Sequence, residues 1–430
     1  MDYDLLIDLG TGSTRATLVD SCGRILSMRS FSNRYYRDEA YPDAQFFLPG
    51  EWQGELMRCC LDLCAEHPEV RIRSVSSAGA RQSLVLLDAE GKAFYGLPNI
   101  DNRGREFMAD IGPKDLNYER SGKWVTEDFC AAKLLGLRMR RPGLYGRIRT
   151  VLSLSGFIAK IFTGNCCFEP SQACETQLYD LETGTWSDYL CDIYGIDPAM
   201  LPPLVMAGES AGPILPDLVE SFEMAPDARF IVGGADTQCA LLQTGLQPGD
   251  VALVSGTTTP VTALTDHRYL DPQQRVWVDA NLRAEGYLLE MNPGVTGLNY
   301  QRIKDVLAPD LSYETLERAY AEKRNFTATA SSAPCCSMSA APCGTADSFS
   351  VPPGRTTWTA STCSGQRWRT SPAPPMNSSS GFARSADTNG TTSSAAAAGS
   401  GPKPSARCSP TSPGWSCGFS PVSTRPRSTA

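Results

Sequence analysis

Apolar and polar residues alternate on both sides of a short polar turn near the start of the chain. Residues 5–9 form an apolar run broken by Asp8, the turn Gly10-Thr11-Gly12-Ser13-Thr14-Arg15 follows, and residues 16–19 alternate again. A further run, 24–28, comes after Ser21-Cys22-Gly23. This spacing predicts a strand, a turn, a second strand and a hairpin. Phosphate-binding turns of P-loop and dinucleotide-binding folds open a helix instead, so the pattern disfavours both folds.

A second glycine-rich turn follows a strand-like run in the middle of the chain. Residues 228–232 lead into Gly233-Gly234-Ala235-Asp236, and residues 237–242 have the pattern of a short helix. Residues 251–254 then precede a hydroxyl-rich turn, Ser255-Gly256-Thr257-Thr258-Thr259. Backbone N–H groups and hydroxyls without bulky neighbours suit phosphate oxygens. The chain therefore has two candidate phosphate turns, with an isolated carboxylate ahead of the second.

This arrangement resembles the FGGY family of carbohydrate kinases, within the actin-like ATPase superfamily. In that superfamily the first phosphate loop joins two antiparallel strands, and its leading aspartate lies near the metal. The resemblance extends from about residue 4 to residue 325. It implies an α/β fold with an actin-like, ribonuclease H-like ATPase domain, ATP and Mg²⁺ as cofactors, and a small sugar or polyol as substrate.

Four segments between the two turns support the resemblance. Residues 77–88 are similar to the family's sugar-side strand, with Arg81-Gln82 where glycerol kinases carry Arg-Glu and xylulokinases Met-His. Residues 98–103 are similar to a Trp-x-Asp-x-Arg stretch, although Asn99 replaces the tryptophan. Residues 154–164 resemble a helix ending in Leu-Thr-Gly, and residues 169–174 stand where the family often reads Asp-x-Ser-Asn-Ala-Ser. The departures leave pentuloses, polyols and a phosphorylated-signal type of substrate open.

Phosphoryl transfer to a hydroxyl requires an in-line acceptor, neutralised phosphate charge and removal of a proton. The resemblance implies that Asp236 contacts the substrate and is the catalytic base, and that Asp8 serves Mg²⁺. The expected phosphate donors are Gly10, Thr11, Ser13, Thr14, Gly256, Thr257 and Thr258. The expected sugar contacts, besides Asp236, are Arg81, Gln82, Asp101 and Arg103.

Each of these residues also has a purely structural interpretation. Asp8 fits a strand-end residue that caps its own turn, and Asp236 fits the N-cap of the following helix. Arg81 and Gln82, expected in a strand, fit a surface pair. Asp101 and Arg103 fit a local salt bridge, and Glu169 fits a loop residue that contacts backbone.

Composition limits the class of protein. The 430 residues are 41% hydrophobic, enough for two large domains. No run approaches the ~20 apolar residues of a membrane span, and the first residues lack the basic region of a signal peptide. The 16 cysteines are scattered and the chain has two histidines, which disfavours a disulfide framework and histidine catalysis. We expect a cytoplasmic protein with reduced thiols, no membrane or nucleic-acid partner, and possible homodimerisation as in the family.

The composition changes abruptly after residue 325. Residues 326–430 contain no Leu, Ile, Glu, Tyr or His, and Ser, Ala, Thr, Pro and Gly dominate. The two acidic and eight basic residues of this segment give it a net charge of about +6. Because the whole chain has a formal net charge of −8, residues 1–325 carry about −14. A natural low-complexity tail is one interpretation, because such a segment has too little apolar surface to offset its ordering entropy.

A translational frameshift close to Phe326 is the other interpretation. Total loss of Leu and Glu, with sporadic Cys and Trp, is typical of a GC-rich gene read in the wrong frame. With GC-rich codons assumed, residues 396–411 can be re-read in one alternative frame as a glycine-rich stretch followed by an amphipathic helix, which resembles the family's adenosine-site motif. The adenosine-binding half is then missing from this translation.

We therefore expect three parts. Residues 1–245 form the first actin-like domain, 246–325 begin the second, and 326–430 form a disordered tail. The expected function is ATP-dependent phosphorylation of a sugar or polyol, impaired in this chain. The alternatives are a catalytically inactive sugar-binding sensor and a non-sugar actin-like ATPase such as a chaperone.

Overall fold

The computed structural model describes residues 2–255, 259–283, 285–292, 294 and 296–322, and six strands beyond them. The chain divides into two compact units. Unit 1 contains residues 1–248 and 263–290, and unit 2 contains residues 249–262 and 291–430. Residues 263–290, which the sequence assigns to the second domain, thus belong to the first unit.

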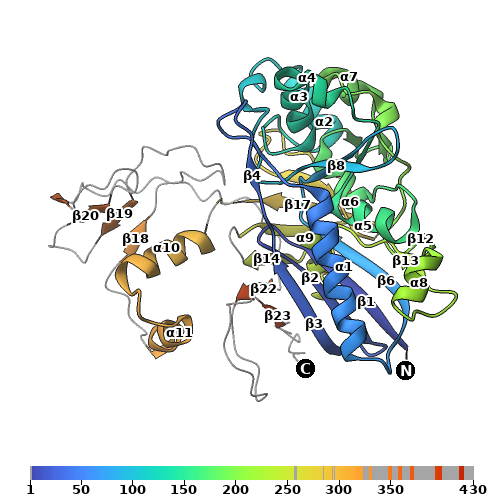
Figure 1. The fold of residues 1–430 in the computed structure, drawn as a ribbon. Coiled ribbons are helices and arrows are strands. Elements are labelled where there is room, and N and C mark those ends of the chain that lie inside the picture. The colour runs from blue at the N-terminus through green and yellow to red at the C-terminus, as the bar shows by residue number, and fades with distance from the viewer. Residues whose placement is uncertain are drawn as a thin grey trace, which may run out of the picture. The chain divides into compact units, whose positions relative to one another are not determined.

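A six-stranded mixed sheet forms the base of unit 1 (Figure 1). Its strands, in spatial order, are β12 (Ser210–Pro213), β13 (Arg229–Ile231), β6 (Arg71–Gly79), β1 (Asp2–Leu9), β2 (Ser13–Asp20) and β3 (Ile25–Ser32). The three central neighbours β13, β6 and β1 run parallel, whereas β2, β3 and β12 are antiparallel to their neighbours. The expected strand, turn, strand and hairpin are confirmed.

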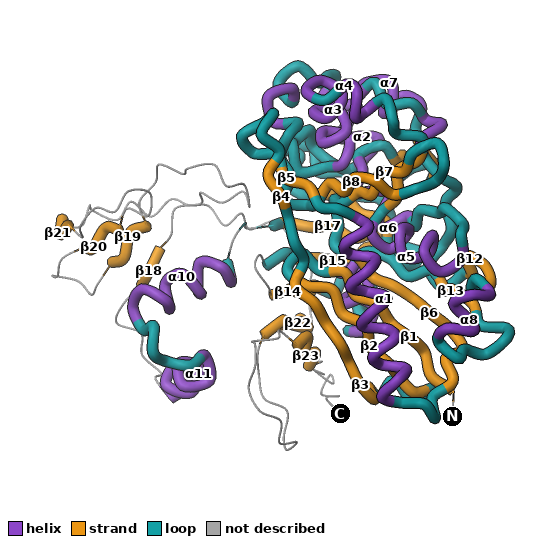
Figure 2. The backbone as a smooth tube through the Cα atoms, viewed as in Figure 1, coloured by secondary structure: helices purple, strands orange, loops and turns teal. Residues whose placement is uncertain are grey.

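Two helices cover one face of this sheet. Helix α1 (Pro49–Glu66) crosses β2 and β3, as Figure 2 shows, and α5 (Leu154–Thr163) packs on β6 and β13. Both helices share one apolar core with the sheet, and the alternation of β1 places Leu5, Ile7 and Leu9 in it. The expected helix at 154–164 is confirmed, and it ends at Gly164 in the left-handed conformation.

A second apolar core of unit 1 lies around a three-stranded sheet. Its strands are β8 (Ala93–Leu97), β7 (Leu84–Leu87) and β9 (Thr150–Leu152). Around this core lie α2 (Lys114–Ser121), α3 (Cys130–Arg140), α4 (Pro142–Tyr145), α7 (Asp188–Tyr194), and the hairpin of β16 (Trp277–Ala280) and β17 (Tyr287–Met291) beside β15 (Val261–Thr265). Smaller elements are β4 (Tyr36–Arg37), β5 (Gln45–Phe46), β10 (Tyr179–Asp180), β11 (Thr185–Trp186), α6 (Pro170–Ala173), α8 (Pro216–Ser221) and α9 (Asp236–Gln243).

In unit 2 the structure describes β14 (Val251–Ser255), α10 (Gly297–Leu307) and α11 (Tyr313–Glu322). It also describes β18 (Thr329–Ser331), β19 (Asp347–Ser350), β20 (Thr357–Ala360), β21 (Arg369–Ser371), β22 (Ser393–Gly399) and β23 (Ser416–Ser420). Strand β14 pairs in parallel with β22. The rest of 326–430, for which the sequence predicts disorder, lies outside the described residues. None of the described helices has the length and apolar character to cross a membrane.

Candidate active site

Three adjacent parallel strands deliver the candidate site residues to one edge of the sheet. Asp8 lies at the end of β1, opposite Ala78 of β6. Arg81 follows the end of β6 by two residues, and Asp236 follows β13. The carboxyl ends of parallel neighbours meet at one edge, which is where ligands bind in open α/β sheets. Residues separated by more than 200 positions in sequence are thereby brought to one place.

Two glycines bring the Asp236 segment close to β6. The N–H of Gly79 donates to the carbonyl oxygen of Gly234 at 3.1 Å. A Cβ atom on Gly233 would lie 1.9 Å from the carbonyl oxygen of Ser77, which no side-chain-bearing residue tolerates. Gly233 is therefore required for this close approach.

Asp236 is the first residue of α9, and Ala235 is the N-cap. The interpretation of Asp236 as the cap is therefore wrong by one position, although its Oδ1 accepts from the N–H of Thr237 at 2.7 Å. Among the described residues, nothing donates to Oδ2, which leaves one oxygen for a substrate proton. Burial raises the pKa of Asp236 to about 6; nearby Arg81 opposes this rise and Asp8 adds to it.

Asp8 is partly exposed and forms an ion pair with Arg15, with 3.2 Å between Oδ2 and Nη1. Burial raises its pKa, and Arg15 counteracts this. Mg²⁺ is usually held through one or two carboxylates, waters and substrate phosphates rather than by a closed protein cage. The open pair of carboxylates, Asp8 and Asp236, fits that preference. The role of Asp8 at the metal stays a prediction.

Side chains of residues that follow β3 form hydrogen bonds to the backbone of the first phosphate turn. The carbonyl oxygen of Gly10 accepts from Asn33 Nδ2 at 2.7 Å, and the carbonyl oxygen of Thr11 accepts from the Tyr35 hydroxyl at 2.5 Å. The prediction that Thr14 donates to phosphate is wrong, because its hydroxyl is buried and donates to Asn33 Oδ1 at 2.9 Å. It is not available to phosphate. The N–H of Gly10, the one donor of that residue, donates to the carbonyl oxygen of Ser13 at 3.1 Å and is likewise not available to phosphate. Thr11 and Ser13 stay candidates, and Gly256, Thr257 and Thr258 lie outside the described residues.

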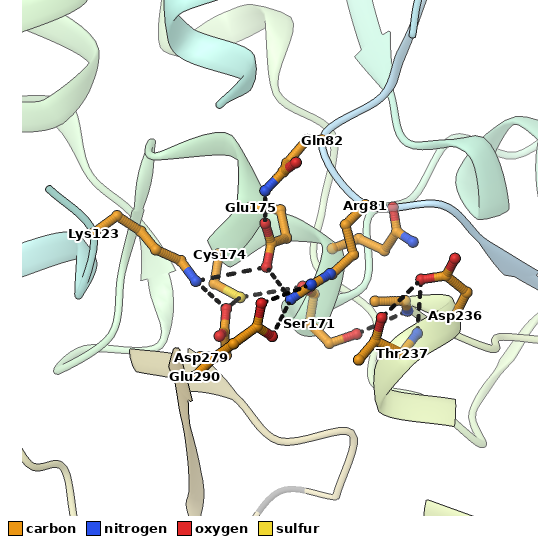
Figure 3. Close-up of polar contacts among 12 residues, drawn as sticks. Arg81, Gln82, Lys123, Ser171, Cys174, Glu175, Asp236, Thr237, Asp279 and Glu290 are labelled. Carbon is orange, nitrogen blue, oxygen red and sulfur yellow. Dashed lines mark hydrogen bonds and ion pairs between the residues drawn. The ribbon is translucent and has the colours of Figure 1, made fainter. Parts of the chain in front are cut away.

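Arg81 and Gln82 lie in the turn between β6 and β7, not in a strand as the sequence suggests. Figure 3 shows Arg81 between a group of carboxylates and Asp236. Its guanidinium donates to both oxygens of Glu290, at 2.7 and 2.9 Å, and to Glu175 at 3.3 Å. Gln82 Nε2 donates to the other oxygen of Glu175 at 2.9 Å. The interpretation as a surface pair is therefore wrong.

The carboxylates that hold Arg81 belong to a buried charge cluster that the sequence analysis missed. Lys123 contacts Asp279 and lies 3.6 Å from Glu175 (Figure 3). Lys123, Glu175 and Asp279 are fully buried, and Glu290 nearly so. Within the part of the chain that the structure describes, the one group with metal-ligand geometry is Cys174, Glu175 and Asp279. The Lys123 ammonium already occupies the position of a cation beside Glu175 and Asp279, so the cluster does not fit a metal site.

Asp101 and Arg103, expected to contact sugar, form a buried ion pair instead. Arg103 Nε donates to Asp101 Oδ2 at 2.7 Å, and Asp101 Oδ1 accepts from the N–H of Gln45 at 2.9 Å. Arg103 also donates to the carbonyl oxygen of Gln45 and to the Tyr95 hydroxyl. Asp101 has no exposed surface and Arg103 only 2%. The prediction that Asp101 and Arg103 contact the sugar is therefore wrong. The alternative interpretation, a local salt bridge, is confirmed.

Residues 169–172 form hydrogen bonds to the backbone just before Arg81 and just before Asp236. Glu169 is the N-cap of α6 and accepts from the Ser171 hydroxyl at 2.5 Å. The same hydroxyl accepts from the N–H of Ala235 at 3.0 Å, and Gln172 Nε2 donates to the carbonyl oxygen of Gly79 at 2.7 Å. The expectation that Glu169 contacts backbone is met through the N–H of Gln172 at 3.2 Å.

Sequence and structure comparisons show which known proteins this chain is similar to. The sequence profile of the FGGY family of carbohydrate kinases, N-terminal domain, matches residues 3–243. This chain belongs to the FGGY family of carbohydrate kinases. It is 38% identical over 314 residues to "Putative sugar kinase YoaC" of Bacillus subtilis, and 26% identical over 322 residues to autoinducer-2 kinase of Klebsiella pneumoniae. These alignments cover 73% and 72% of the chain and 64% and 60% of the relatives, so the chain spans less than two thirds of their length.

Solved FGGY-type kinases share the fold. Xylulose kinase from Rhodospirillum rubrum superposes with a TM-score of 0.68 at 22% identity, over 76% of this chain and 69% of that one. Plasmodium falciparum glycerol kinase with ADP gives 0.68 at 18% identity, over 76% and 68%. The expected actin-like ATPase fold of the FGGY kinase is thereby confirmed.

Proposed function

We propose that this FGGY chain catalyses ATP-dependent phosphorylation of a hydroxyl group on a small sugar or polyol. The observation that carries the proposal is the position of Asp236. It lies beside Arg81 and across from Asp8, at the carboxyl ends of three adjacent parallel strands, with one free carboxylate oxygen. A kinase of this type requires a carboxylate at such a place to take the acceptor proton.

The remaining chemistry is positional and electrostatic. Arg81 and Gln82 orient the acceptor, and backbone N–H groups of the first phosphate turn bind phosphate oxygens. Mg²⁺, held through Asp8 and water, would supply neutralising charge on the phosphates. Asp236 accepts the hydroxyl proton as the phosphoryl group leaves ATP. Kinases of this type also need an adenosine-binding part and closure over the reactants for full activity.

A sugar-binding sensor without catalysis is the second candidate. It is favoured by the composition of residues 326–430, which cannot supply the apolar core of an adenosine-binding half. Unit 1 alone carries Asp236, Arg81 and Gln82, so sugar binding does not depend on that half.

The two candidates are distinguished by one assay on the full chain. D-Xylulose, glycerol and D-gluconate are each added with ATP and Mg²⁺, and ADP release and the melting temperature are measured. A kinase releases ADP only when one of the sugars is present. A rise in melting temperature without ADP release identifies the sensor. Absence of both effects with every compound contradicts the proposed function.

A further inference from the structure

One buried carboxylate holds both side chains of the substrate-side turn. Glu175 Oε2 accepts from Gln82 Nε2 at 2.9 Å, and its Oε1 accepts from Arg81 Nη1 at 3.3 Å. Glu175 has no exposed surface, whereas Gln82 and Arg81 are partly exposed. Figure 3 shows the Gln82 amide turned with its nitrogen toward Glu175. Glu175 therefore lies behind the turn and is shielded from solvent.

The chemistry of this contact fixes which end of the Gln82 amide faces outward. An ionised carboxylate only accepts hydrogen bonds, so the NH₂ group of Gln82 must face it. The carbonyl oxygen Oε1 then points away from Glu175, and no residue in the described part of the chain donates to it. The turn thus presents a hydrogen-bond acceptor.

The surroundings keep Glu175 ionised. Burial alone would raise its pKa, but Lys123 and Arg81 lower it below its usual value. Burial raises the pKa of neighbouring Asp279 despite its contact with Lys123. Glu175 therefore keeps its charge beside Lys123 and Arg81, and it remains a pure acceptor.

The backbone of the turn is held as firmly as its side chains. Gln82 has a φ of 60°, in the left-handed region that non-glycine residues rarely adopt. The buried Lys133 ammonium donates to its carbonyl oxygen at 2.7 Å, and to those of Pro98 and Asn99 at 3.0 and 3.1 Å. Strained backbone held in this way is found mostly at functional sites. Gln82 is thus fixed in backbone and side chain.

We propose that Glu175 is a specificity-determining positioning residue of the sugar site. By holding the Gln82 amide through Nε2, it makes Oε1 an acceptor for a hydroxyl of the substrate and disfavours a substrate with a carbonyl oxygen or no oxygen at that position. The inference rests on the proposed function, because it assumes that Gln82 contacts the sugar. A site that lacks its hydrogen-bonding partner loses binding strongly, since its polar group is then left unpaired.

An exchange of amide and carboxylate tests the proposal. The variants are Gln82→Glu, Glu175→Gln and the double variant, with the exposed Glu90→Gln as the control. The probe is D-xylulose, or whichever sugar of the panel above raises the wild-type melting temperature most. The measured quantities are the dissociation constants of the sugar and of ATP.

Gln82→Glu places two carboxylates together, and we expect at least tenfold weaker sugar binding. In the double variant the new amide at position 175 can donate to the new carboxylate at position 82, which again leaves an acceptor facing the sugar. We expect sugar affinity within about threefold of wild type there, and unchanged ATP affinity and control behaviour throughout. A merely structural role of Glu175 would lower both affinities and would not be reversed by the second substitution.

Two results would overturn the inference. The first is a double variant that binds sugar no better than Gln82→Glu while its melting temperature is at the wild-type value. The second comes from Gln82→Met, which keeps every charged residue of the buried cluster and serves if the Glu175 variants do not fold. Unchanged sugar affinity in this variant would show that Oε1 makes no contact. A wild-type chain that binds no sugar would instead contradict the proposed function itself.

Discussion

The Asp236 carboxylate has one oxygen held by Thr237 and one oxygen free, and it lies among other charges. A base must be ionised to accept a proton, and its efficiency is greatest when its pKa lies near the working pH. Burial raises the pKa of Asp236 to about 6, which keeps it ionised at neutral pH yet more basic than an exposed aspartate.

The pH dependence of phosphoryl transfer follows from this pKa. Below pH 6 Asp236 is protonated and cannot take the hydroxyl proton, so we expect the sugar-dependent rate to fall about tenfold per pH unit. Above pH 7 the rate should be constant. The measurement is sugar-dependent ADP release between pH 5 and 8.5, and a flat profile across that range would contradict the role of Asp236.

Glu169 predicts a different pH effect, on stability. Burial raises its pKa from 4.5 to about 7, and its Oε1 is buried without a partner among the described residues. Between pH 4.5 and 7 the folded chain holds a proton on Glu169 that the unfolded chain has lost. The contribution of Glu169 to the free energy of unfolding is therefore fully present below pH 4.5 and is lost as the pH rises through 7. The loss is on the order of 3 kcal/mol.

Glu169→Gln is neutral at every pH and should remove that dependence. We expect the free energy of unfolding to decline less between pH 5 and 8 in the variant than in the wild type, measured by urea denaturation. Equal declines would show that Glu169 is ionised in the folded chain throughout.

At the scale of elements, locally encoded features are the ones that sequence predicts. The β1–β2 turn and the β2–β3 hairpin follow from alternation and glycine position, and α9 follows from the helix-like pattern of residues 237–242. Helix α5 was expected from the resemblance of residues 154–164 to the family's helix. Residues 77–88 resemble the family's sugar-side strand, which predicts Arg81 and Gln82 in a strand, whereas the structure has a turn there. The strained turn there depends on Lys133 and Glu175, which come from other elements.

The buried cluster had no signal in the sequence. Lys123 and Asp279 are 156 residues apart, and Arg81 and Glu290 are 209 apart. No spacing rule links such positions, because only the packing of β16 and β17 against the rest of unit 1 brings them together. Asp101 and Arg103 show the converse: the sequence offered both a sugar contact and a salt bridge, and only burial decides between them.

The close approach of β13 and β6 gives a prediction at this scale. Gly233→Ala would place a methyl group against the carbonyl oxygen of Ser77, so the strands must separate. We expect a loss of about 1–3 kcal/mol in the free energy of unfolding, with reduced sugar-dependent activity because Asp236 moves. The matched control is Gly54→Ala in α1, where nothing lies near the new Cβ. It should be stabilised by up to about 1 kcal/mol. Equal stability of the two variants would contradict the packing argument.

At the scale of the whole molecule, the chain combines one unit that carries the sugar-side residues with a second that has an unusual composition. The family match ends at residue 243, and the chain spans less than two thirds of its relatives. The abrupt loss of Leu, Ile and Glu after residue 325 has no precedent in the preceding part of the chain. We propose a shift of reading frame close to Phe326, which would produce the whole change in one step.

Sequencing of the gene across codons 315–345, with translation in three frames, tests that account. We expect a second frame to continue with strands and helices that contain Leu, Ile and Glu, ending in a glycine-rich adenosine motif. Stop codons in that frame, together with a mass spectrum of the expressed protein that matches the present sequence, would establish a natural low-complexity tail.

The measurement that tests the central claim most directly is phosphoryl transfer by Asp236→Asn. Sugar-dependent ADP release and sugar affinity are measured side by side in the wild type, in this variant and in Asp227→Asn, an exposed aspartate ahead of β13. Loss of a general base costs about 10²–10⁴-fold in rate, so we expect that loss in Asp236→Asn, sugar affinity within about threefold of wild type, and no change in Asp227→Asn. A rate within tenfold of wild type would contradict the assignment of Asp236 as the base at this sheet edge.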